Sequence, residues 1–308
     1  MRVRVYRDPA FASHQPGPHH PESPDRYRAI LSILQDRPDA PWTFATPTEA
    51  SQDMVALAHD AEFVEALLAA VPREGFAAVD SDTVMSPDSG RAALLGAGAA
   101  VAAVDDVIAG TADRVFCAVR PPGHHAEHNR AMGFCLFNNL AVAARHALTV
   151  DGIERVSIVD FDVHHGNGTQ DIFWSDPRVQ YLSSHQMPLY PGTGASDETG
   201  VGNIVNVPLL AGCDSESFRQ AYNQRLLPAL REFDPDLLLV SAGFDAHRLD
   251  PLASLNLETG DFAWVTRELV AVAADLCQGR LVSALEGGYH LQALADSVLA
   301  HVEVLASS

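Results

Sequence analysis

Histidine and aspartate, the residue types that bind metals and move protons, gather in four short segments of the sequence. These segments are 120–126, 160–168, 241–247 and 286–290. In the second, Asp162 and His164 stand two residues apart, so in an extended chain both side chains project to one side and can reach one ion. Asp245, from the third segment, would complete a site with three protein ligands and an open position, as in a catalytic metal centre. Two carboxylates and an imidazole suit zinc, and iron(II) or cobalt would also be accepted.

Each of these motifs has a plainer interpretation. An Asp-x-His turn can simply be solvated, and the spacing alone favours that interpretation. Here, however, the turn ends an apolar run, and tandem histidines end another run, which favours a metal site. Of those tandem histidines, His124 and His125, one can act as a general base and the other as an electrostatic partner, or both can merely bond to backbone. Tyr289, after two glycines, can donate to a developing oxyanion or be a packed loop aromatic.

The elements that must position these segments alternate along the chain. Short β-branched runs stand at 2–6, 114–119, 155–161, 179–183, 203–207, 236–240 and 280–284, and stretches with helical periodicity at 90–109, 140–150, 215–233 and 261–276. Alternation of this kind predicts one doubly wound α/β domain over residues 1–308, with a parallel sheet covered by helices on both faces. Such sheets bind ligands beyond the carboxyl ends of their strands, where the four segments stand.

Composition limits the classes of function. The 308 residues carry 20 Lys and Arg against 40 Asp and Glu, a net charge of −20. This charge repels nucleic acid and anionic membranes and attracts cations at long range. The longest apolar run, 92–104, is too short to cross a bilayer and predicts a buried helix. The start of the chain has no signal-peptide pattern, and the four cysteines are scattered, so we expect four reduced thiols in the core of a cytoplasmic protein. A nucleotide site is not expected, because the glycine-rich segment 191–194 lacks the P-loop lysine.

Taken together, the motifs resemble the histone deacetylase superfamily, specifically its bacterial, class II-like deacetylases and amidohydrolases. The resemblance extends over nearly the whole chain, through segments 19–26, 120–126, 133–139, 159–170, 190–194, 241–245 and 286–289. It implies the single-domain arginase/deacetylase-like α/β fold, in which a narrow tunnel leads to zinc at the edge of a central parallel sheet. It also implies one zinc ion per chain, bound by Asp162, His164 and Asp245.

The resemblance assigns further roles by position. The implied catalytic residues are His125 as general base, His124 beside it, Tyr289 as oxyanion donor, Asp160 orienting His124, and Asn167 orienting His125. The implied substrate-binding residues are Asp82, Gly133, Phe134, Tyr190, Leu252 and Gly288. A structural potassium ion would use Asp160, Ser183 and the carbonyls of Asp162, His164 and Ser184.

Two positions depart from the pattern of related branches. Asn167 stands where other branches carry aspartate, so His125 lacks a charged partner and is expected to be less basic. Tyr190 places a hydroxyl where phenylalanine is more usual.

Three other functions compete with a lysine deacetylase. A two-manganese ureohydrolase is rejected, because Gly166 and His247 stand where it needs aspartates. A non-catalytic acetyl-lysine reader is disfavoured by the presence of Tyr289. An acetylpolyamine amidohydrolase is the serious rival, but its branch carries glutamate at the position of Leu252, and Asp82 matches a rim aspartate that suits a peptide. We therefore expect an acetyl-lysine or similar acetylated amine as the substrate, with no nucleic-acid or membrane partner and with homo-oligomerisation left open.

Overall fold

The computed structural model describes residues 1–37 and 39–307, which contain one eight-stranded parallel sheet with the strand order β2-β1-β5-β10-β9-β6-β7-β8. Its strands are β1 (Val3–Tyr6), β2 (Trp42–Ala45), β5 (Arg114–Cys117), β6 (Val156–Asp160), β7 (Val179–Gln186), β8 (Ile204–Leu209), β9 (Leu237–Ala242) and β10 (Leu281–Leu285). A separate antiparallel pair consists of β3 (Ala77–Ala78) and β4 (Val84–Met85).

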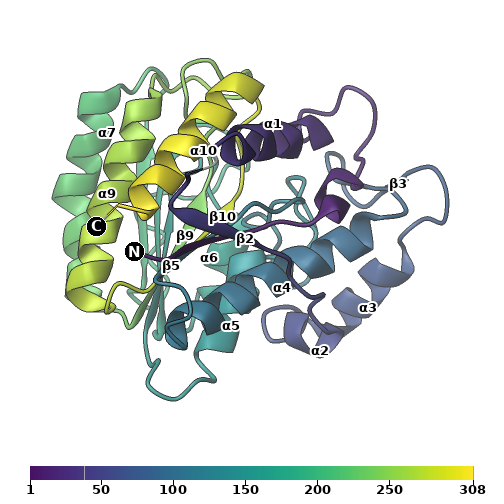
Figure 1. Cartoon of the computed structure of the whole chain (residues 1–308), viewed down its shortest axis with the longest axis horizontal. Coiled ribbons are helices and arrows are strands. Elements are labelled where there is room, and N and C mark those ends of the chain that lie inside the picture. The colour runs from purple at the N-terminus through teal and green to yellow at the C-terminus, as the bar shows by residue number, and fades with distance from the viewer. Residues whose placement is uncertain (38, 308) are drawn as a thin grey trace.

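Helices cover both faces of this sheet (Figure 1). One layer contains α1 (Pro24–Gln35), α7 (Ser215–Ala221), α8 (Leu227–Phe233), α9 (Thr259–Leu276) and α10 (Leu291–Leu305), and the other contains α4 (Ser89–Ile108), α5 (Asn139–Ala147) and α6 (Asn167–Phe173). Two further helices are α2 (Gln52–Val55) and α3 (Ala61–Ala69), and a 3₁₀ turn stands at Pro9–Ala12. The expected single α/β domain with a central parallel sheet is therefore confirmed.

The central strands form at the short β-branched runs of the sequence, although β7 also contains buried polar residues. Every residue of β5, β6, β7, β9 and β10 is buried, as expected for parallel strands covered on both faces. All seven predicted runs are strands of the sheet, and the apolar run 92–104 lies within the buried helix α4. The strand β2 was not predicted, because it is short, half-exposed at the sheet edge and flanked by Pro41 and Pro47.

The predicted helix at 215–233 is interrupted. A π-helical turn, Tyr222–Leu226, separates α7 from α8. Pro228 explains the interruption, because it has no N–H to donate to the carbonyl of Gln224 one turn earlier, and a wider turn accommodates the missing bond. The prediction of helical structure at 215–233 was therefore correct, but the prediction of one continuous helix was wrong.

A buried ion cluster fixes the N-terminal part of the chain to the edge of the sheet. Glu22, wholly buried, pairs with Arg26 Nη1 at 3.0 Å and with Arg120 Nη2 at 2.8 Å. Burial opposes the charge of Glu22, but Arg120 and Arg26 outweigh it and hold the pKa of Glu22 well below its usual value. Both arginines also donate to backbone carbonyls, Arg26 to Gly288 and Arg120 to Phe11, so this cluster connects three distant segments.

Glu22→Ala is expected to lower the free energy of unfolding by about 3–5 kcal/mol, because it leaves two buried guanidinium groups without their carboxylate. Urea denaturation followed by circular dichroism measures this change. The matched control is Glu303→Ala, which removes a glutamate from a half-exposed pair with Arg37 and is expected to cost less than about 1 kcal/mol. Equal losses in the two variants would contradict the prediction.

Candidate active site

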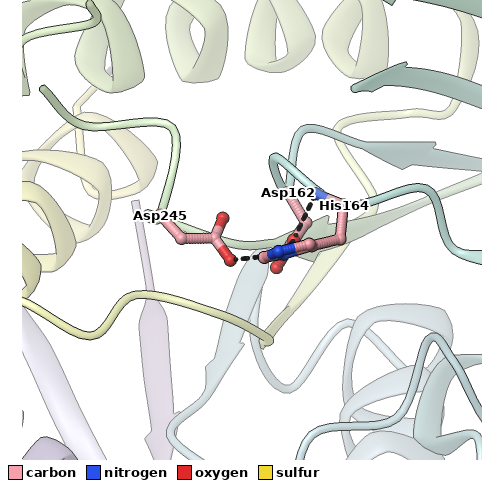
Figure 2. Close-up of side chains that lie close together, drawn as sticks. All are labelled: Asp162, His164 and Asp245. Carbon is pink, nitrogen blue, oxygen red and sulfur yellow. Dashed lines mark hydrogen bonds and ion pairs between the residues drawn. The ribbon is translucent and has the colours of Figure 1, made fainter. Parts of the chain in front are cut away.

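Asp162, His164 and Asp245 come together at the carboxyl edge of the sheet (Figure 2). The first two follow β6 and the third follows β9, and these strands are neighbours in register, so their terminal turns leave the sheet side by side. His164 Nδ1 lies 3.2 Å from Asp162 Oδ1 and 3.1 Å from Asp245 Oδ2. All three residues are buried, and one ligand atom from each lies within 4.8 Å of the others. The structure thus brings together the three residues that the sequence predicted to bind a metal.

The charges in this cluster suit a cation. Among residues 1–37 and 39–307, the two aspartates accept hydrogen bonds only from His164 and from backbone N–H groups, Asp162 from Gly287 at 2.7 Å and Asp245 from Val163 at 2.9 Å. In the part of the chain that the structure describes, no lysine or arginine pairs with either carboxylate. Burial opposes a charge on His164, yet hydrogen bonds to the two carboxylates raise its pKa to about 10. The two buried carboxylates of Asp162 and Asp245 and the imidazole nitrogen of His164 that faces them form a set of ligands that fits a divalent metal ion.

The tandem histidines differ in their partners and in their charge. His124 Nδ1 donates to Asp160 Oδ2 at 3.0 Å, whereas His125 Nδ1 donates to the amide oxygen of Asn167 at 2.8 Å. Burial disfavours a charge on His124, but Asp160 and Asp162 outweigh it and raise its pKa to about 10. Burial and the neighbouring His124 lower the pKa of His125 well below its usual value. His125 is therefore the neutral member of the pair, with a lone pair available to accept a proton.

A cavity of about 220 Å³ leads from the surface to this cluster. Its lining residues are Asp82, His125, Gly133, Phe134, His164, Leu189, Tyr190, Leu252 and Tyr289. His164 belongs to both the cluster and the lining, so the cavity reaches the predicted metal site. Gly133 is required at this position, because its φ is +58° and a Cβ would lie 2.4 Å from the His125 ring. Leu189 was not predicted. Gly288 is not among the lining residues, and its carbonyl accepts a hydrogen bond from Arg26.

Tyr289 is fixed on several sides. Its backbone N–H donates to Asp250 Oδ2 at 2.7 Å, and its ring lies 4.9 Å from the Arg26 guanidinium and 5.9 Å from the Phe134 ring. Burial raises the pKa of Tyr289 well above its usual value, so the phenol keeps its proton at neutral pH. A protonated phenol at the wall of the cavity can donate a hydrogen bond to a substrate oxygen.

Two acidic residues near the site were given no role from the sequence. Glu286 Oε2 accepts hydrogen bonds from the backbone N–H groups of Gly123 at 2.7 Å and His124 at 3.1 Å, which connects the histidine segment to the Tyr289 segment. Asp250 connects the Tyr289 segment to Leu252, whose N–H donates to Asp250 Oδ1 at 3.0 Å. In the sequence, Glu286 and Asp250 are single acidic residues near a motif, and such residues are too common to indicate a role.

The remaining candidate residues fall into two groups. Asp160 pairs in register with Ser183 across β6 and β7, and both residues are buried, as is Ser184. The hydroxyls of the two serines contact His185 and Tyr222 respectively. His247 and His290, from the functional segments, do not join the cluster. His290 instead accepts a hydrogen bond from the N–H of Ala293 at the start of α10.

No second cluster with metal-binding geometry occurs among residues 1–37 and 39–307. At Gly166, where a two-metal ureohydrolase needs a carboxylate, a Cβ would lie 2.5 Å from Asp160 Oδ2. Within the same residues, none of the helices is both long and apolar enough to span a bilayer. All four cysteines are free thiols, three buried and Cys213 half-exposed, which corrects the expectation that all four lie in the core.

The parallel sheet and the structural match place the chain in the arginase/deacetylase fold class, with the buried Asp162–His164–Asp245 cluster at the edge of the sheet. The histone deacetylase domain family matches residues 20–305, and the chain belongs to this family. The histone deacetylase-like amidohydrolase of Pseudomonas aeruginosa is 40% identical over 276 residues, 88% of this chain and 72% of the relative. Histone deacetylase 10, chloroplastic, of Oryza sativa subsp. japonica is 42% identical over 300 residues, 91% of this chain and 68% of the relative. The crystal structure of the HDA15 HD domain superposes with a TM-score of 0.93 at 38% identity, covering 99% of this chain and 88% of that one.

Proposed function

We propose that this chain is a zinc-dependent deacetylase that hydrolyses the acetyl amide of an N-acetylated lysine side chain. The observation that carries the proposal is that His164 connects the buried Asp162–His164–Asp245 cluster to a narrow cavity also lined by His125 and Tyr289. Zinc bound by these three residues would act as a Lewis acid on the amide carbonyl and lower the pKa of a bound water. Membership of the histone deacetylase family supports the same reaction class.

The other steps of the proposed reaction are assigned to residues around the cavity. Neutral His125 accepts the proton of the attacking water, and its bond to Asn167 holds the ring in place. His124, kept charged by Asp160, supplies positive charge next to it. Tyr289 donates a hydrogen bond to the carbonyl oxygen as negative charge develops there. Phe134 and Tyr190 line the cavity, where their rings can pack against the aliphatic chain of the substrate.

The proposal is tested by a deacetylation assay on an acetyl-lysine peptide, acetylputrescine and acetylspermidine. Activity on the peptide that is lost with a chelator and restored by added zinc is the expected result. Absence of activity on all three substrates in the zinc-loaded protein would overturn it. A structural potassium site at Asp160, Ser183 and Ser184 and a cytoplasmic location both remain predictions, and two relatives are named chloroplastic.

Leu252 is expected to favour the peptide over polyamines. It lines the cavity as an apolar residue, and so offers no charge to the ammonium groups of an acetylpolyamine. The net charge of −20 attracts all cations but hardly discriminates between them. We therefore expect kcat/KM to be higher for an acetyl-lysine peptide than for acetylputrescine.

Leu252→Glu is expected to shift that ratio of kcat/KM values towards acetylputrescine by about fivefold, because a partly exposed ion pair contributes on the order of 1 kcal/mol. Leu252→Gln is the matched control, since it has the shape of glutamate without the charge. A wild-type preference for acetylpolyamines would identify the rival function instead.

A further inference from the structure

The orientation of the Asn167 side chain decides which nitrogen of His125 carries a proton. Asn167 Oδ1 accepts from His125 Nδ1 at 2.8 Å, so the proton of the neutral imidazole is on Nδ1 and the lone pair is on Nε2. Within the described residues, no side chain or backbone group hydrogen-bonds to Nε2, and His125 lines the cavity. Only this tautomer can accept a proton from a water molecule in the cavity. If the amide were turned over, its NH₂ group would face Nδ1 and favour the opposite tautomer.

The neighbours of Asn167 prevent that rotation. Its Nδ2 donates to Glu127 Oε1 at 2.7 Å and lies 3.3 Å from Met132 Sδ and 3.5 Å from the His125 carbonyl. All three partners are acceptors, so a turned amide would place its oxygen against acceptors only. The carboxylate of Glu127 is the strongest of the three, because a hydrogen bond to a charged group is short and about twice as strong as a neutral one. Asn167 itself is buried at the first position of α6, which fixes its backbone.

We propose that Glu127 is a positioning residue that acts through Asn167 to set the tautomer of His125. The amide of an asparagine can be turned so that its NH₂ group, rather than its oxygen, faces His125. A carboxylate at the same position would accept the hydrogen bond from His125 Nδ1 with either oxygen. Asn167 therefore needs a hydrogen-bond acceptor next to its Nδ2, so that its Oδ1 stays turned towards His125. Glu127 is that acceptor. Glu127 touches neither the cavity nor the metal cluster, and its backbone contacts to Arg130 and His59 do not involve its side chain. This inference rests on the proposed role of His125 as general base.

The test is a double-mutant cycle on the zinc-loaded full chain with an acetyl-lysine peptide. Glu127→Ala is expected to lower kcat about tenfold with KM little changed, because it reduces the fraction of His125 in the competent tautomer. In an Asn167→Asp background the same change is expected to cause no loss, or a gain, because the introduced carboxylate needs no orientation and Glu127 only repels it. Glu127→Gln, which keeps the shape, is expected to fall between wild type and Glu127→Ala. Asn129→Ala, an exposed change two residues after Glu127, is the matched control and should leave kcat unchanged.

A second readout does not depend on activity. The ¹⁵N chemical shifts of the His125 ring distinguish protonated from unprotonated nitrogens, and comparison with a His125→Ala sample assigns them. We expect a protonated Nδ1 in the wild type and a mixture of tautomers in Glu127→Ala. Equal losses of kcat in both backgrounds, an unchanged kcat in Glu127→Ala, or an unchanged His125 tautomer would overturn the inference. Failure of the proposed function is distinguishable, because it would leave the wild type inactive while the NMR result stands.

Discussion

Asp245→Asn is expected to abolish deacetylase activity and to reduce the zinc bound per chain to near zero. The proposed site has three protein ligands among the residues that the structure describes, and this change replaces one carboxylate by a neutral amide. Asparagine keeps the shape of aspartate, and its oxygen can still accept the bond from the Val163 N–H. The expected loss is therefore one of metal affinity rather than of folding. Activity assays, metal analysis of the purified variant and its circular dichroism spectrum measure the three quantities.

Asp162→Ala is expected to have the same effect on activity and metal content, but it is the less specific test. Asp162 also accepts the N–H of Gly287, so removing its carboxylate disturbs the segment that carries Tyr289. Asp151→Asn, an exposed aspartate in the turn before β6, is the matched control and should retain zinc and activity. Full activity with stoichiometric metal in either ligand variant would contradict the assignment of the site.

The grouping of Asp162, His164 and Asp245 could be predicted because it depends on short stretches of sequence. Asp162 and His164 are two residues apart at the end of an apolar run, and in a parallel sheet every such end lies at the same edge. Asp245 follows another run of the same kind, so a general rule about sheets was sufficient to bring the three together. The finer roles of Tyr289 and the two histidines came from the family resemblance, since their motifs alone fit ordinary turns equally well.

The supporting residues could not be predicted because their function depends on loop packing. Asp250 and Glu286 act by accepting backbone N–H groups from segments 39 and more than 160 residues away. Glu127 reaches His125 only through Asn167, although it stands two positions after His125 in the sequence. The spacing of residues does not encode such contacts, and an isolated acidic residue carries no signal. The π-helical turn before α8 was missed for a different reason, since the apolar pattern continues across it.

Tyr289→Phe is expected to lower kcat by roughly 100- to 1,000-fold, the usual cost of removing one oxyanion donor, with KM little changed. The substitution keeps the ring that packs against Arg26 and Phe134 and removes only the hydroxyl. The backbone bond from residue 289 to Asp250 is also retained, so the segment should keep its position. Zinc content is expected to stay at the wild-type level, because Tyr289 is not among the clustered ligands. A large loss of rate with normal metal and normal KM is the signature of a group that acts in the transition state.

Tyr190→Phe provides the control for this prediction. It removes a second phenol hydroxyl from the same cavity, 39% exposed and in edge contact with His125, so it tests whether any loss of a hydroxyl slows the reaction. We expect turnover close to wild type, because only Tyr289 is assigned to the developing oxyanion. The pH profile adds a third check: burial raises the pKa of Tyr289 well above its usual value, so its deprotonation should not reduce kcat below about pH 10, the ordinary pKa of a phenol. Wild-type turnover in Tyr289→Phe would show that the oxyanion is stabilised by other groups and that this tyrosine only packs.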